Sequence, residues 1–315
     1  MAVRRVDLGR IEGVEVGHSE SDSGATGVTA MLFGRQAPTV VDVRGGASAT
    51  YDTASLSLDS TYGARWAIFL AGGSLFGLDA ARGVRTRVLE LGRGTQPFGN
   101  PNVVAPISGA ALFDLPRRSR DIPDYLPLGY EAARRATSDP VPVGRVGAGA
   151  GATVGKYLGR DRAMPGGLGA AAARVGPRGH LAVLLAINSV GAVRDPESGR
   201  WLAGARGRNG RVVPPRSREI GRARGRGTTL AIVVTDLAVG RPALARAGAI
   251  VHAGIGSAIV PYLTASDGDV LFVASTDRVR LGRTESRPGE FGDLIGLRAA
   301  ELAVRAARVA VQPGN

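Results

Sequence analysis

The sequence contains no cysteine, which excludes disulfides, thiolate metal sites and cysteine nucleophiles. Its three histidines, His18, His180 and His252, are far apart in the chain, so their spacing gives no metal-binding motif. A G-x-S-x-G nucleophile elbow is also missing. We therefore expect no metal and no other cofactor, and the common routes to nucleophilic catalysis are mostly closed.

Long apolar runs are scarce as well. The longest uninterrupted ones, such as residues 181–187, are far too short to span a bilayer. The early arginines of the N-terminal stretch are not followed by an apolar segment, so we expect no signal peptide. These features predict a cytoplasmic protein that does not enter the membrane.

Lysine is nearly absent, because Lys156 is the one lysine among the 40 basic residues. A lysine offers a compact ammonium with a tunable proton that arginine cannot supply, although chance explains a single survivor equally well. The surrounding stretch, GAGAGATVGKYLG, is not a Walker loop, since Ala150 and Tyr157 stand where glycine and Ser or Thr are required. It also lacks a clean dinucleotide fingerprint.

The net charge of +13 is concentrated in one place. Residues 194–227 hold ten arginines against two glutamates and one aspartate, and the tract is rich in glycine and proline. Such a composition predicts a flexible, solvated segment. A nucleic-acid-binding protein that uses this tract is the non-enzyme alternative, and the sparse aromatic residues weigh against it.

A chain of 315 residues with 44% hydrophobic residues and 47 glycines is typical of a compact α/β protein, and it could hold one large domain or two ordinary ones. The arginine-rich tract is the only plausible boundary, but it leads directly into an apolar strand, so we interpret 1–315 as a single domain. Short apolar runs predict strands, and amphipathic or alanine-rich stretches predict helices, the first of them capped by Ser74. The expected strands are 37–44, 66–73, 181–188, 228–236 and 269–276, and the expected helices follow Ser74 and cover 242–260 and 291–311.

One catalytic route needs neither cysteine nor histidine. A Thr or Ser at a newly made N-terminus can be activated by its own α-amine, whose ordinary pKa is about 7.7–8.0. The Gly227–Thr228 bond suits this chemistry, because a glycine-rich tract precedes it and an apolar strand follows it. An ordinary strand start after glycine is the simpler explanation of these residues alone.

Several motifs, in order, resemble those of the DmpA-type self-processing aminopeptidases, which include L-aminopeptidase/D-esterases, β-aminopeptidases and nylon-oligomer hydrolases. The motifs are GVEVGH, VDVRGGA, AGGSLFGLDAARGV, VGAGAGATVGKYLG, LLAINSVGAV, GTTLAIVVTD and SDGDVLFVAST. The resemblance runs nearly end to end. It implies an α/β fold of the αββα sandwich type.

Residue by residue, the resemblance makes Thr228 the nucleophile, freed by cleavage after Gly227 into fragments 1–227 and 228–315. It implies that Lys156 is an active-site cation and that Asn188 belongs to the oxyanion hole. Acidic residues that orient the nucleophile match Asp267 and Asp269, for which the Asp-Gly turn is the structural alternative.

Three departures from the family pattern concern substrate choice and processing. Gly227 replaces a frequent asparagine, Phe113 stands where tyrosine is common near the substrate, and Tyr51 stands where arginine is common. The resemblance implies a small peptide or amide substrate and a homo-tetramer or larger assembly. Hydrolysis of nylon-type oligomers and acyl transfer by a related fold are the enzymatic alternatives.

Overall fold

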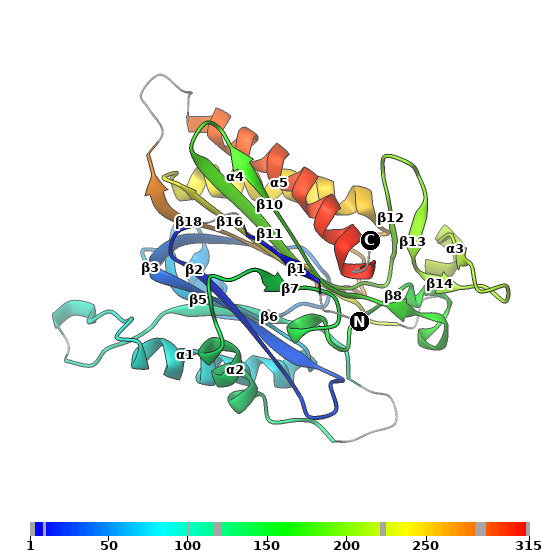
Figure 1. The fold of residues 1–315 in the computed structure, drawn as a ribbon, viewed down its shortest axis with the longest axis horizontal. Coiled ribbons are helices and arrows are strands. Elements are labelled where there is room, and N and C mark those ends of the chain that lie inside the picture. The colour runs from blue at the N-terminus through cyan, green and yellow to red at the C-terminus, as the bar shows by residue number, and fades with distance from the viewer. Residues whose placement is uncertain are drawn as a thin grey trace.

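The computed structural model describes residues 4–8, 11–99, 101–115, 121–220, 225–280 and 288–312. Two β-sheets lie face to face between two pairs of helices (Figure 1). The predicted αββα sandwich is confirmed.

The first sheet contains the strands that lead to the site. Its order is β10 (Gly167–Val175), β11 (Gly179–Asn188), β16 (Thr228–Leu237), β18 (Val270–Val279) and the second half of β3 (Gly27–Val43). β16 pairs antiparallel with β11 and parallel with β18. Two neighbouring strands therefore bring Asn188 and Thr228 to the same edge of the sheet.

The second sheet is joined to the first by β3. Residues 28–32 of this strand pair with β5 (Ala64–Ala71), and residues 39–43 pair with β18. β2 (Val14–Glu20), β6 (Ile107–Ala111) and β4 (Ala49–Tyr51) complete the second sheet. A single long strand thus crosses from one layer into the other.

Each outer face is covered by two helices (Figure 1). α4 (Arg241–Ala258) and α5 (Pro288–Val311) pack on the first sheet, while α1 (Ala80–Glu90) and α2 (Tyr125–Arg134) pack on the second. Among the described residues, no helix is both long and apolar enough to cross a membrane.

Alternate side chains of β11 pack into two different cores, which explains why this strand has no polar face. Val183 and Leu185 pack in the core under α4 and α5, whereas Ala182 and Leu184 pack in the core between the sheets. Since both faces of the strand are covered, both must be apolar. The predicted strand 181–188 is confirmed, as are strands 66–73, 228–236 and 269–276 and helices 242–260 and 291–311, with shifts of one to three residues in their bounds. The predicted strand 37–44 is the second half of the longer β3, and the helix predicted after Ser74 begins only at Ala80.

Ser74 does not cap a helix, and that prediction is wrong. The segment Ser74–Asp79 is a 3-10 helix (η2), and α1 begins at Ala80. Ser74 has a φ of 57° and its amide donates to the Leu112 carbonyl. A left-handed residue cannot adopt the extended backbone of an N-cap.

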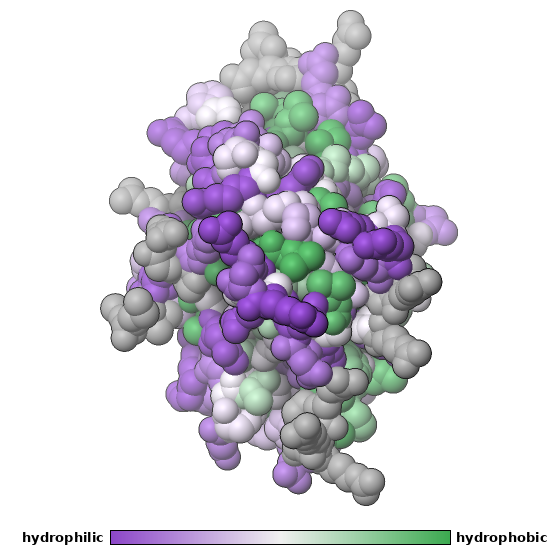
Figure 2. Space-filling model, turned by 90° about the vertical axis from the view of Figure 1, so that its right-hand side faces the viewer, coloured by the Kyte–Doolittle hydropathy of each residue, from purple (hydrophilic) through white to green (hydrophobic). Residues whose placement is uncertain are grey.

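The described part of the arginine-rich segment forms short elements. These are β12 (Ala192–Arg194), β13 (Trp201–Ala203), β14 (Ala205–Arg206), β15 (Val212–Val213) and α3 (Ser217–Ile220). The Tyr157 hydroxyl holds two of them, since it accepts from the Ala205 amide and donates to the Val213 carbonyl. The face of the molecule on which α3 lies is mostly hydrophilic (Figure 2). The flexibility of the segment stays a prediction, and residues 221–224 lie outside the described residues.

The remaining short elements complete the description. They are the strands β1 (Arg5–Val6), β7 (Val141–Pro142), β8 (Thr153–Val154), β9 (Met164–Pro165) and β17 (Ile259–Val260), and the 3-10 helices η1 (Ala54–Leu56), η3 (Pro97–Gly99), η4 (Gly147–Gly149), η5 (Lys156–Leu158) and η6 (Arg160–Arg162).

Candidate active site

The Gly227–Thr228 peptide lies at the start of β16, in the middle of a buried polar cluster. Thr228 is opposite Asn188 in the antiparallel register with β11, and Gly227 forms a parallel bridge to Asp267. The side chains of Thr228, Asn188, Lys156, Asp267 and Asp269 are each at most 3% exposed. Five residues spread over more than 110 positions of sequence therefore meet in one buried region.

Lys156 is the centre of this cluster. Its ammonium donates to the carbonyls of Thr153, Asn188 and Ser189 and to Asn188 Oδ1, at 2.5 to 3.3 Å. Burial lowers the pKa of Lys156 to about 7, and the nearby Asp267 carboxylate opposes that shift. All four contacts are acceptors, so the environment suits a protonated amine that holds its neighbours in place.

Asn188 uses both ends of its side-chain amide. Its Oδ1 accepts from Lys156 Nζ at 2.9 Å and from the Thr153 amide at 3.0 Å. Its Nδ2 donates to the carbonyl of Phe113 at 2.8 Å. This side chain therefore links three segments, and its amide donor is used by the Phe113 carbonyl.

Asp267 and Asp269 flank the start of β16 from the turn before β18. Asp267 Oδ1 accepts from the Val190 amide at 3.0 Å, and its Oδ2 accepts from the Thr264 hydroxyl. Asp269 Oδ1 accepts from the Thr229 amide at 2.5 Å. The carboxylates thus hold the backbone of Val190 and of Thr229, the residue after Thr228. The turn before β18 closes where the Asp267 amide donates to the Thr264 carbonyl, so Asp267 belongs to it and Asp269 follows it. That the two acids orient a nucleophile stays a prediction.

Burial shapes the charge of these two acids. It raises the pKa of Asp267, against hydrogen bonds from Thr264 and Val190 and the charge of Lys156. Burial, together with the negative charge of Asp267, raises the pKa of Asp269 to about 7. Two carboxylates close together in a buried site cannot both ionise cheaply.

The carbonyl of Gly227 is held from two sides. It accepts from the Gly268 amide at 3.0 Å and from the hydroxyl of Thr228, the residue that follows it. The hydroxyl oxygen therefore lies next to the peptide bond that would have to break. Gly268 was missed in the sequence, because a backbone donor leaves no trace in residue type.

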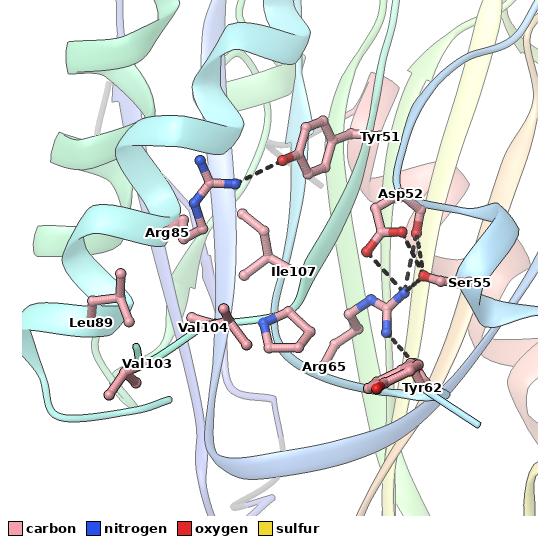
Figure 3. Close-up of a pocket in the computed structure, with 12 residues that line it drawn as sticks. Tyr51, Asp52, Ser55, Tyr62, Arg65, Arg85, Leu89, Val103, Val104 and Ile107 are labelled. Carbon is pink, nitrogen blue, oxygen red and sulfur yellow. Dashed lines mark hydrogen bonds and ion pairs between the residues drawn. The ribbon is translucent and has the colours of Figure 1, made fainter. Parts of the chain in front are cut away.

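Phe113 and Tyr51 lie in different surroundings. Phe113 gives its carbonyl to Asn188, and the Arg160 guanidinium lies 5.3 Å from the centre of its ring. Tyr51 lines a pocket of about 420 Å³ in which its hydroxyl accepts from Arg85 (Figure 3). Among the described residues, the lining of this pocket includes no member of the Thr228 cluster. The hydrogen bond to Asn188 therefore joins Phe113 to the cluster, whereas Tyr51 lies in a pocket that the cluster does not line.

Two further residues near the cluster were not predicted from the sequence. Thr153 gives its amide to Asn188 and its carbonyl to Lys156. Asp114 accepts from the Gly73 amide at 2.7 Å, and burial raises the pKa of Asp114 to about 6. Its place directly after Phe113 was a possible signal in the sequence, whereas its burial, unusual for a charged residue, became visible only in the structure.

The arrangement of layers matches that of known structures. A β-aminopeptidase of Burkholderia has the same fold, with a TM-score of 0.68 over 98% of this chain and 88% of its own, at 16% identity. The L-aminopeptidase D-Ala-esterase/amidase of Ochrobactrum anthropi, described as a variant of the Ntn hydrolase fold, gives 0.67 over 99% and 86%, at 18% identity. The fold is therefore that of the N-terminal-nucleophile hydrolases.

Sequence comparison then gives the family. Residues 7–310 match the model of Peptidase family S58, and the chain belongs to this family. A 6-aminohexanoate-oligomer endohydrolase of Agromyces is 32% identical over 94% of this chain and 81% of its own length. An uncharacterized aminopeptidase of Mycobacterium tuberculosis is 32% identical over 85% and 81%. The predicted family is confirmed, and the protein is a peptidase or amidohydrolase.

Proposed function

We propose that this protein is a self-processing amidohydrolase whose nucleophile is Thr228, freed by cleavage of the Gly227–Thr228 bond. The observation that carries the proposal is the contact between the Thr228 hydroxyl and the Gly227 carbonyl inside a buried cluster of cation, amide and carboxylates. Its substrates are short peptides, aminoacyl amides or esters, from which it releases the N-terminal residue.

Processing begins with attack of Thr228 Oγ1 on the carbonyl carbon of Gly227. The new C–O bond forms as the C–N bond breaks, and the hydroxyl proton ends on the Thr228 nitrogen. Water then hydrolyses the ester, which leaves a carboxylate on Gly227 and returns the hydroxyl to Thr228. The Gly268 amide, already 3.0 Å from the Gly227 oxygen, stabilises the oxyanion of the first step.

Turnover repeats this chemistry on an external amide. The free α-amine of Thr228 takes the hydroxyl proton and passes it to the leaving amine, and water releases the acyl group. Lys156 and Asn188 stabilise the oxyanion together with the Gly268 amide. For this, Asn188 Nδ2 exchanges its bond to the Phe113 carbonyl for one to the oxyanion. The cation of Lys156 also favours the neutral form of the neighbouring α-amine.

Denaturing mass spectrometry of the purified protein tests the proposal. The wild type should give two fragments whose masses correspond to 1–227 and 228–315, and Thr228→Ala should stay a single 32.3 kDa chain without amidase activity. A wild-type chain that stays whole for days, or an active Thr228→Ala variant, would refute it. In the second case Thr229 would be the nearest other hydroxyl.

We further propose that the processed units form a homo-tetramer or larger assembly in the cytoplasm. Leu75 and Phe76 support association, since they are 68% and 49% exposed on one short 3-10 helix. Light scattering coupled to gel filtration tests the assembly, and cell fractionation tests the compartment. A monomeric αβ unit at micromolar concentration would contradict the first proposal.

A further inference from the structure

Gly227 occupies a space that admits no L side chain. A Cβ atom built on Gly227 would lie 2.2 Å from Asp267 Oδ1, 2.4 Å from the Val190 nitrogen and 2.8 Å from the Ser189 carbonyl carbon. Contacts below 3.0 Å are essentially never made by real Cβ atoms. The backbone conformation of Gly227 is not left-handed, so space is the reason for glycine here.

The walls of this space are fixed. Two of the three blocking atoms belong to the backbone of Ser189 and Val190, directly after β11. The third, Asp267 Oδ1, accepts from the Val190 amide, while the other oxygen of Asp267 accepts from Thr264. Asp267 is 1% exposed, so it cannot turn outward without breaking both bonds in the interior.

The backbone of Gly227 is held by two hydrogen bonds. Its amide donates to the Ser266 carbonyl at 3.0 Å, and its own carbonyl accepts from the Gly268 amide at 3.0 Å. One residue before it, Arg226 is exposed, and Gly225 lies against the Lys156 stem, with a Cβ position 2.7 Å from Lys156 Cβ. Segment 225–227 therefore runs from beside Lys156, through the exposed Arg226, to the carbonyl beside Thr228.

From these contacts we infer that the space of Gly227 is the acyl subsite of the processed enzyme, and that it selects acyl groups with an unsubstituted methylene next to the scissile carbonyl. This inference rests on the proposed function, because segment 225–227 must leave after cleavage for a substrate to enter. Glycyl and β-alanyl groups fit, and so does a longer unbranched ω-aminoacyl chain in the space that residues 225 and 226 leave. L-α-aminoacyl groups with a side chain meet Asp267 and Val190.

The test compares p-nitroanilides of glycine, β-alanine, L-alanine and L-leucine on the processed wild-type enzyme. Glycyl and β-alanyl substrates should exceed the L-alanyl one in kcat/KM by on the order of 100-fold, at the upper end for one methyl group in a rigid site. L-Leucyl turnover should be lower still. Comparable kcat/KM for glycyl and L-alanyl substrates would overturn the inference and leave the proposed function intact.

A second measurement uses the precursor itself. Gly227→Ala should slow the appearance of the 228–315 fragment by at least about tenfold, whereas Arg226→Ala, at the exposed neighbour, should process at the wild-type rate. Wild-type processing of Gly227→Ala would show that the subsite accepts a Cβ atom and would refute the inference. An unprocessed wild type would refute the proposed function, and the inference with it.

Discussion

Asn188 and Thr228 lie directly opposite each other at the paired ends of β11 and β16. Asn188 is also the residue through which the Lys156 ammonium, the Thr153 amide and the Phe113 carbonyl are joined. The sheet register therefore fixes where the amide stands relative to the hydroxyl, and the amide in turn fixes the lysine. Catalytic groups carried by adjacent strands are positioned more rigidly than groups on loops.

Exchange of Asn188 for aspartate separates its two roles. The carboxylate of Asn188→Asp can still accept from Lys156 and Thr153, but it cannot donate to Phe113 or to an oxyanion. We expect the fold to persist and kcat to fall by about 10²–10³, the cost of a lost oxyanion donor. Steady-state kinetics with circular dichroism check this.

The control for that variant is Asn209→Asp, which makes the same change at an exposed residue. It should keep wild-type kinetics. Full activity in Asn188→Asp would show that no donor is needed at this position.

Lys156→Arg keeps the charge but changes its shape. The ammonium of Lys156 is fully buried with four oxygen acceptors around it, and a planar guanidinium cannot reproduce that arrangement. We expect kcat/KM to fall by at least about 100-fold, equivalent to ~3 kcal/mol of transition-state stabilisation. Initial rates on a glycyl p-nitroanilide measure the loss.

Arg162→Lys, the reverse exchange at an exposed position nearby, is the control and should change little. Near wild-type turnover in Lys156→Arg would mean that the single lysine of the chain is there by chance.

His18 makes the fold sensitive to acid. Burial lowers the pKa of His18 to about 4, from an ordinary value of 6.5. Between these values the unfolded chain binds a proton that the folded protein does not, so stability is lost as the pH falls from 6.5 to about 4. The full loss amounts to ~3 kcal/mol.

Urea unfolding at pH 7 and pH 4.5 measures this effect in the Thr228→Ala background, where the chain stays uncut. His18→Gln should weaken the drop in the urea midpoint, because glutamine does not titrate. The same change at His180, a half-buried histidine paired with Asp236, serves as the comparison. An equal drop with and without His18 would assign the acid sensitivity to other groups.

Much of the fold was predictable from local pattern, because strands buried on both faces are apolar throughout. The runs 181–188 and 228–236 were recognisable for that reason, and they are β11 and β16. The passage of β3 between the two sheets was not predictable, since it depends on pairing with β18 far along the chain. The cap predicted at Ser74 was wrong because a left-handed backbone is not visible in residue type.

The candidate site, like the fold, was predictable from the sequence only in part. The residue types of Lys156, Asn188 and Thr228 could be singled out from the family resemblance, but not the hydrogen bonds between them. The donor from Gly268 and the acceptors from Thr153 and Ser189 are backbone groups, which any residue supplies. The presence of Gly227 was visible in the sequence, whereas its closeness to Asp267 and Val190 required the structure.

The most direct test of the account is to capture the acyl-enzyme. The processed protein should be quenched in acid during turnover of a glycyl ester, and the 228–315 fragment analysed by mass spectrometry with peptide mapping. If Thr228 is the nucleophile, the fragment begins at Thr228 and carries one glycyl group on that residue's hydroxyl. A glycyl group on any other residue, or turnover by a chain still intact at Gly227–Thr228, would contradict it.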